Sequence, residues 1–212
     1  GVNTELKNWL SVYKGESDKV SKYFSDELEI STPCANRAIA PTGSIGILAG
    51  TSTGIEPIFS VAYKRRYLKG NKKWVYQYVV DSAAQELIDL YGIDPDKVES
   101  ALDLSEHYEK RIKFQADVQD YVDMAISSTI NLPAWGSKLN NPDTVDKFAD
   151  TLASYASRLR GFTCYADGSR GGQPLTSVRY SEAVSKLGEE FEEHIETHDI
   201  CDISGTGGSC GV

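Results

Sequence analysis

Hydrophobic residues recur at helical spacing in three stretches of the chain. Residues 1–30 are mostly polar, with apolar side chains repeating along one face and Thr4 as a candidate N-cap. Phe114–Ser127 has a clear apolar stripe of the same period. The third stretch opens at Asn141-Pro142 and is closed by Gly161. We therefore predict three amphipathic helices, each packing through one face.

Segments rich in β-branched and aromatic residues lie between these helices. Ile58–Tyr67 and Trp74–Val80 flank a turn signal at Lys69–Lys72, which predicts a β-hairpin. Ser128–Leu132 and Phe162–Tyr165 each read as a short strand next to a predicted helix. Strands that alternate with helices favour a parallel α/β arrangement.

The pattern changes after Gly172. An acidic helix is predicted from Ser181 to about His198, and a segment rich in Gly and Ser follows it. Such a segment buries too little surface to offset the entropy lost on ordering, so we expect a flexible tail.

One short stretch combines the end of a strand, a glycine turn and the start of a helix. It follows the apolar run Ala38–Ala40 and consists of Pro41, Thr42, Gly43, Ser44 and Ile45. This geometry presents free backbone N–H groups to an anion, and glycine lets a ligand approach the backbone closely. The stretch is therefore a candidate phosphate-binding loop. The alternative is an ordinary Pro-Gly turn in which Ser44 acts as the N-cap.

Composition narrows the classes of function. The chain has 212 residues and a formal net charge of -9, so broad binding to nucleic acid is not expected. It contains no apolar run of the roughly 18–20 residues needed to span a membrane. The spacing of its four Cys residues indicates neither a zinc ribbon nor a secreted disulfide framework, and we expect a reducing, cytoplasmic setting. Because it starts at Gly1 and Met124 is its one Met, we expect a fragment or a processed piece.

A series of short motifs resembles the C-terminal part of the adenosylcobalamin-dependent (class II) ribonucleotide reductase family. The motifs are Ala40–Ile45, Ser52–Phe59, Ala62–Arg66, Asp117–Asp123, Ser127–Pro133, Leu159–Thr163, Tyr165–Arg170 and the final Gly207–Gly211. Each motif is short, but their joint order is specific to that family. The resemblance covers nearly the whole chain from about Ile30.

The resemblance implies an architecture and a reaction. Residues 1–172 would form part of a ten-stranded α/β barrel, and residues 173–212 an acidic helix and a flexible redox tail. The family converts ribonucleotides to deoxyribonucleotides for DNA synthesis by a radical mechanism started by adenosylcobalamin. Pro41, Thr42, Gly43, Ser44 and Ile45 would hold the phosphates of a ribonucleoside diphosphate or triphosphate. The expected partners are this substrate and the N-terminal half of the reductase.

The chain departs from the family at the motif that carries the radical-bearing Cys. The family has Asn-Pro-Cys-x-Glu there, whereas Cys34 lies in Thr-Pro-Cys-Ala-Asn. We therefore expect Cys34 to be a buried thiol without that role, and the chain alone not to turn over substrate. A different class of function, a non-catalytic nucleotide-binding or regulatory module, stays open.

Two tail thiols form the other candidate site. In the family, a C-terminal Cys pair reduces the active site by thiol–disulfide exchange and is recharged by thioredoxin or glutaredoxin-type donors. Cys201 and Cys210 match this pair. A zinc site with His194 and His198 is an alternative, as is a tail without a role whose His side chains are solvated. We expect no metal.

Three further features have both structural and functional interpretations. Lys64-Arg65-Arg66 could attract phosphates or could be a solvated strand end. Glu56 could contact the ligand or serve a structural role. Cys164, in an apolar strand, is expected to be a small core residue.

Overall fold

The structure is a computed structural model that describes residues 2–70, 73–169 and 175–192. The chain forms two compact units, each built from two separate segments. The first unit comprises Gly1–Ile58 and Glu99–Ala166, and the second comprises Phe59–Val98 and Asp167–Val212. The pattern of residues along the chain does not indicate that residues 59–98 group with the C-terminal segment. The division of the chain after residue 172 stays a prediction.

The first unit begins with a long helix, α1, spanning Thr4–Glu27. Its N-cap is Asn3, whose side chain accepts a hydrogen bond from the Leu6 N–H at 2.8 Å, so the expected cap at Thr4 is wrong by one residue. Asn3 has the extended backbone that a cap requires, whereas Thr4 already lies in the helix. A short helix, α2 (Gly43–Ala49), begins within the candidate loop and ends before Gly50, which has a positive φ.

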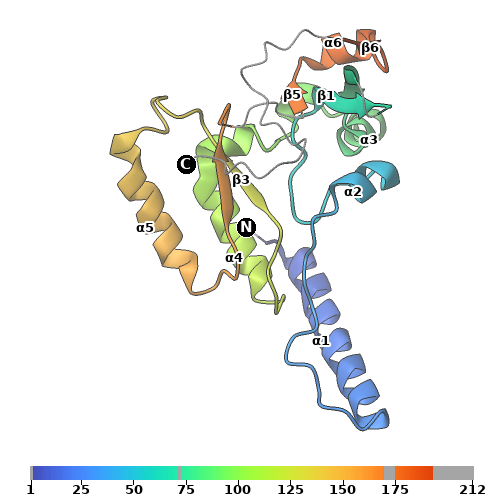
Figure 1. Ribbon diagram of the computed structural model, residues 1–212, viewed down its shortest axis with the longest axis vertical. Coiled ribbons are helices and arrows are strands. Elements are labelled where there is room, and N and C mark those ends of the chain that lie inside the picture. Colours follow the sequence, from blue (N-terminus) through green and yellow to red (C-terminus); the bar gives the residue numbers. More distant parts are fainter. Residues whose placement is uncertain (1, 71–72, 170–174, 193–212) are drawn as a thin grey trace. The chain divides into compact units, whose positions relative to one another are not determined.

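The remaining helices of this unit are η2 (Asp103–His107), α4 (Tyr108–Gln119), η3 (Pro142–Thr144) and α5 (Val145–Ala156). The predicted opening at Asn141-Pro142 is confirmed, because Asn141 and Thr144 form a capping box there. Helix α5 packs on α4, in part through an edge-to-face contact between Phe148 and Tyr108. Two parallel strands, β3 (Thr129–Leu132) and β4 (Thr163–Ala166), lie beside α4 in Figure 1.

The parallel arrangement predicted for this part of the chain is confirmed. Strand β3 pairs with β4 in register from Thr129↔Thr163 to Leu132↔Ala166, and Ile39 makes an isolated parallel bridge to Ile126. The fold is α/β, but the described residues form no closed barrel. The core of this unit centres on Val118, Val122 and Ile126, against which Ile39 packs.

Helix α4 begins and ends earlier than predicted. Its last residue is Gln119, and the rest of the expected helix, up to Ser127, is a turn and an extended segment. Distant side chains hold the carbonyls there: Lys14 donates to the Asp120 carbonyl and Arg37 donates to the Tyr121 carbonyl, both at 3.0 Å. Tertiary hydrogen bonds thus replace those that would have continued the helix.

The second unit is built around an antiparallel sheet in the order β5-β1-β2-β6. The predicted hairpin is confirmed as β1 (Ala62–Lys69) and β2 (Lys73–Val80), paired along their whole length. The outer strands are short: β5 spans Leu175–Ser177 and β6 spans Glu190–Phe191. Helix α3 (Ser82–Tyr91) and the turn η1 (Pro95–Lys97) follow the hairpin, and α6 (Tyr180–Ser185) contacts β1 and β2.

The predicted acidic helix from Ser181 to about His198 is wrong within the described residues. Helix α6 ends at Ser185, and Gly188 has a φ of 76°, a left-handed conformation that favours glycine. The chain then pairs with β2: Gly188 donates to the Tyr78 carbonyl at 3.1 Å, and Tyr78 donates to the Glu189 carbonyl at 3.3 Å. The open edge of β2 therefore overrides the local helical preference of the glutamates.

Candidate functional site

The predicted phosphate-binding loop lies at the surface of the first unit. Pro41, Gly43 and Ile45 are exposed, and Thr42 is half-buried. The loop leads from Ile39, which bridges to Ile126, into α2 at Gly43. The strand–turn–helix geometry expected from the sequence is present, although the strand is reduced to one bridge. The backbone N–H groups of the first turn of a helix have no partner within it, so they can bind an anion.

Thr42 has a structural contact in addition to its expected role as a donor. Its hydroxyl oxygen accepts a hydrogen bond from the Gly54 N–H at 3.1 Å, and its carbonyl accepts from the Gly46 N–H at 2.7 Å. A threonine hydroxyl can accept and donate at once, so its proton stays free to reach a phosphate oxygen. The side chain thus fastens the loop to the segment that follows α2.

Two glycines in this region differ in their surroundings. A Cβ atom built on Gly43 meets nothing within 4 Å, whereas one built on Gly46 would lie 2.5 Å from Cγ2 of Thr53. Gly46 therefore allows α2 to pack against the segment after it. Gly43 borders open space, where a missing Cβ is useful to a ligand rather than to the fold.

Glu56 forms a clamp with Arg111 that sequence analysis did not identify. One carboxylate oxygen accepts from Arg111 at 2.6 Å and the other accepts from the Thr129 N–H at 2.5 Å. The Arg111 side chain is only 8% exposed and also donates to Ser128 and to the Thr129 carbonyl. The structure therefore shows the structural role for Glu56: it holds the segment that contacts Thr42 and Gly46 onto the start of β3.

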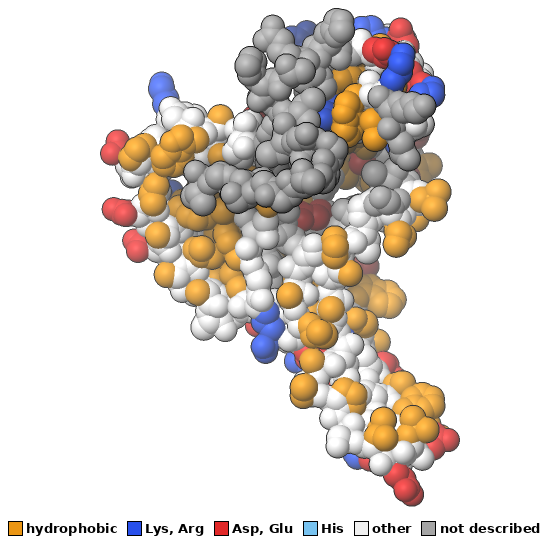
Figure 2. Space-filling view, in the orientation of Figure 1, with side chains coloured by type: hydrophobic (Ala, Val, Ile, Leu, Met, Phe, Trp, Pro, Cys, Tyr) orange, Lys and Arg blue, Asp and Glu red, His pale blue; other side chains and the backbone are white. Residues whose placement is uncertain are grey.

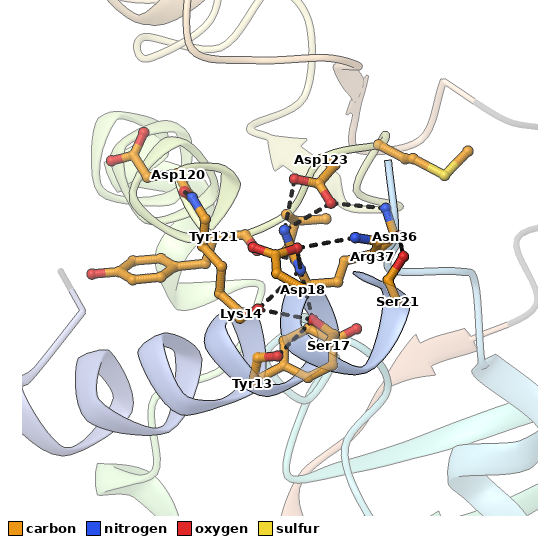
Figure 3. A network of polar contacts seen from close by, with 12 residues as sticks. Tyr13, Lys14, Ser17, Asp18, Ser21, Asn36, Arg37, Asp120, Tyr121 and Asp123 are labelled. Carbon is orange, nitrogen blue, oxygen red and sulfur yellow. Dashed lines mark hydrogen bonds and ion pairs between the residues drawn. The ribbon is translucent and has the colours of Figure 1, made fainter. Parts of the chain in front are cut away.

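A second cluster, centred on Arg37, connects α1 with the segment leading to the loop (Figure 3). Arg37 is 2% exposed and pairs with Asp18 at 2.5 Å and with Asp123 at 2.8 Å. It also donates to the carbonyls of Lys14 and Tyr121 and to the Ser17 hydroxyl, at 3.1, 3.0 and 2.6 Å. The buried charge is thus fully paired, which a guanidinium in this setting requires.

Acid should weaken the Arg37 cluster. Hydrogen bonds from Arg37 and Asn36 hold the pKa of Asp18 below its ordinary 3.8, and the Asn36 N–H and Arg37 do the same for Asp123. A lowered carboxyl pKa adds stability above its unfolded value, and this is lost as the pH falls through the folded value. We expect unfolding free energy to fall below about pH 4. In urea titrations from pH 6 to pH 3, D18N should lose less stability than the parent; equal losses would contradict this.

The basic run and the cysteines also have defined surroundings. Arg65 donates to Gln77, and Arg66 lies 4.1 Å from the ring centroid of Trp74, so the run is part of the hairpin surface. Cys34 is exposed, because it lies in irregular chain after α1, and the expectation of a buried thiol is therefore wrong. Cys164 is half-buried in β4, and burial raises the pKa of its thiol.

The predicted tail site lies outside the described residues: Cys201, Cys210, His194 and His198 all fall in 193–212. Within the described ranges there is no group of three or more His, Cys, Asp or Glu side chains placed to hold a metal ion. Nor does any helix in those ranges have the length and apolar character needed to cross a bilayer.

The chain is similar to known reductases. It is 29% identical to the vitamin B12-dependent ribonucleoside-diphosphate reductase of Mycobacterium tuberculosis, over 73% of this chain and 24% of that protein. It is 30% identical to a protein of Mycobacterium phage D29 assigned as an adenosylcobalamin-dependent ribonucleoside-triphosphate reductase, over 81% of this chain and 28% of the relative. The chain thus spans about a quarter of the length of these relatives.

Comparison of structures gives the same fold. A crystal structure of a B12-dependent (class II) ribonucleotide reductase superposes with a TM-score of 0.57 at 16% identity, over 85% of this chain and 26% of the other. The model of the ribonucleotide reductase barrel domain matches residues 34–165, which include the candidate loop, the Glu56 clamp, β3 and all but the last residue of β4. The chain therefore belongs to the ribonucleotide reductase barrel-domain family.

Proposed function

We propose that this chain supplies the substrate phosphate-binding loop of a ribonucleotide reductase that converts ribonucleotides to deoxyribonucleotides. The observation that carries the proposal is the position of Pro41–Ile45: these residues lie within the matched barrel domain and at the surface, where a Cβ atom on Gly43 would meet no other atom within 4 Å. Because the chain spans about a quarter of its relatives, turnover requires the rest of the reductase. That remainder would also complete the ten-stranded barrel.

The loop would bind the substrate through its backbone and hydroxyl groups. The N–H groups of Gly43, Ser44 and Ile45 would donate to oxygens of the terminal phosphates, and the Thr42 hydroxyl would add a further donor. Hydrogen bonds to a charged phosphate are stronger than those between neutral groups, so a few of them suffice to orient a ribonucleotide. The Glu56 clamp keeps the segment behind the loop in place during binding.

Cys201 and Cys210 would recharge the active site. One thiolate attacks a sulfur of the disulfide left by substrate reduction and releases the other sulfur as a thiolate, giving a mixed disulfide. The second thiol then attacks the tail sulfur, so the active site regains two thiols and the tail becomes a disulfide. A thioredoxin or glutaredoxin-type reductant would return two electrons to the tail.

The names of the relatives point to adenosylcobalamin as the cofactor of the complete enzyme, where it would supply the initiating radical. Three cavities of the first unit, of about 190, 320 and 360 Å³, are each too small to enclose a corrin with its nucleotide loop.

Gly43→Ala tests the loop directly. The added methyl group meets no protein atom, so the fold should be unchanged within about 0.5 kcal/mol. It would obstruct the approach of a phosphate, and we expect affinity for a ribonucleoside diphosphate, measured by calorimetry, to fall roughly 10-fold or more.

Gly15→Ala is the matched control, because a Cβ at Gly15 on α1 also meets nothing within 4 Å. Its affinity for the same nucleotide should equal that of the parent. A parent chain that binds the nucleotide while G43A binds it equally well would refute the assignment of the loop.

A further inference from the structure

The β1–β2 hairpin of the second unit is strongly basic. Its two strands contain no Asp or Glu and carry five cations: Lys64, Arg65, Arg66, Lys69 and Lys73. The segment that pairs with the outer edge of β2 is acidic, with Glu189, Glu190 and Glu192 among its described residues. Figure 2 shows positively and negatively charged side chains close together where β1 and β6 appear in Figure 1. The two segments are thus complementary in charge.

Backbone pairing between them is brief. Strand β6 has two residues, paired as Tyr76↔Phe191 and Gln77↔Glu190. Two further hydrogen bonds join Tyr78 to Gly188 and Glu189. A strand this short holds weakly by its ladder alone. The stability of the contact must therefore come largely from side chains.

Side chains supply ionic and aromatic contacts. Glu190 accepts from Lys69 at 2.5 Å and from the Tyr67 hydroxyl at 2.6 Å, and Glu192 accepts from Lys73 at 3.1 Å. These hydrogen bonds from Lys69 and Tyr67 lower the pKa of Glu190. The Phe191 ring stacks on Tyr76 with centroids 5.6 Å apart, and the Lys64 ammonium lies 5.7 Å from the Phe191 centroid.

We propose that the outer edge of the β1–β2 hairpin is an electrostatic docking site for an acidic extended segment, occupied here by the chain's own Gly188–Glu192. The ion pairs are solvated: Lys73 and Glu192 are 68% and 64% exposed. Such pairs are individually weak and are screened by salt. Docking is therefore reversible on its own, while the hairpin, paired over eight positions, stays folded. The proposal does not depend on reductase activity.

Hydrogen exchange of the full chain tests it. The double variant K69E/K73E turns both attractive pairs into repulsive ones. We expect the amides of Gly188 and Tyr78, which bond across the docking contact, to exchange about tenfold faster than in a charge-matched control. That control is K7E/K138E, whose lysines are exposed in the first unit and form no ion pair among the described residues. Amides bonded between β1 and β2 should keep their protection.

Swapping the charges of the two segments distinguishes a loss of docking from a general loss of stability. Adding E190K/E192K to K69E/K73E restores opposite charges, and we expect protection of both amides to return to within about twofold of the control. Unchanged exchange in K69E/K73E would overturn the proposal, and so would a fourfold variant that exchanges as fast as the double variant. Loss of nucleotide binding at Gly43 would alter none of these rates, so the two proposals fail separately.

Discussion

Replacing Arg37 with alanine should lower the free energy of unfolding by about 3–5 kcal/mol. The guanidinium is 2% exposed and donates to α1, to the Tyr121 carbonyl and to Asp123. Its removal leaves the carboxylates of Asp18 and Asp123 without this cation, and it deletes the hydrogen bonds to the Lys14 and Tyr121 carbonyls and to the Ser17 hydroxyl. Urea unfolding monitored by circular dichroism measures the loss of unfolding free energy, and we expect α1 to unfold first.

Arg160→Ala is the matched control for this experiment. Arg160 is exposed, and its side chain forms no ion pair among the described residues, so R160A should change stability by less than about 0.5 kcal/mol. Arg37→Lys should fall between the two, because lysine keeps the charge but not the planar set of donors. A loss in R37A no larger than that in R160A would show that the cluster does not hold α1.

Glu56→Gln should cost about 3 kcal/mol in stability and also weaken nucleotide binding. The amide oxygen can still accept from Thr129, but the Arg111 guanidinium, 8% exposed, loses its counter-charge. The segment after α2 is fastened at its far end by this clamp, so a looser clamp lets Thr42 and α2 move. Urea unfolding and calorimetry with a ribonucleoside diphosphate measure the two effects.

Two further variants make this result specific. Glu99→Gln removes an exposed carboxylate that forms no ion pair among the described residues, and it should leave both quantities near the parent values. The double variant E56Q/R111M removes both charges, and it should lose less stability than E56Q alone. If E56Q/R111M is less stable than E56Q, the uncompensated charge is not the cause of the loss.

Local signals in the sequence predicted the elements that depend on local chemistry. The turn between β1 and β2, the capping box at Asn141 and the parallel strands after α4 and α5 each follow from residues close together in the chain. The candidate loop belongs to this class too, since its glycine and hydroxyl residues are consecutive.

Interactions between distant segments were not predictable in this way. Arg37 binds oxygens 84 and 86 residues away, and Arg111 pairs with Glu56 from 55 residues away. An arginine gives no local sign that its partners lie elsewhere. The early end of α4 and the strand at Glu190 have the same origin, because a distant donor or a free strand edge outweighed the local helical pattern.

The interleaved order of the two units has a consequence for synthesis on the ribosome. Strand β1 pairs with β5 across more than a hundred intervening residues, as in Tyr63↔Ser177. Strand β2 pairs with β6 across a similar separation, as in Tyr76↔Phe191. Because translation starts at the N-terminus, the hairpin emerges long before either flanking strand exists. Once they exist, pairing must still close loops of this length, which is slow. Both edges of the hairpin stay unprotected while the intervening segment is translated, and chaperones or early dimers would encounter the nascent protein there first.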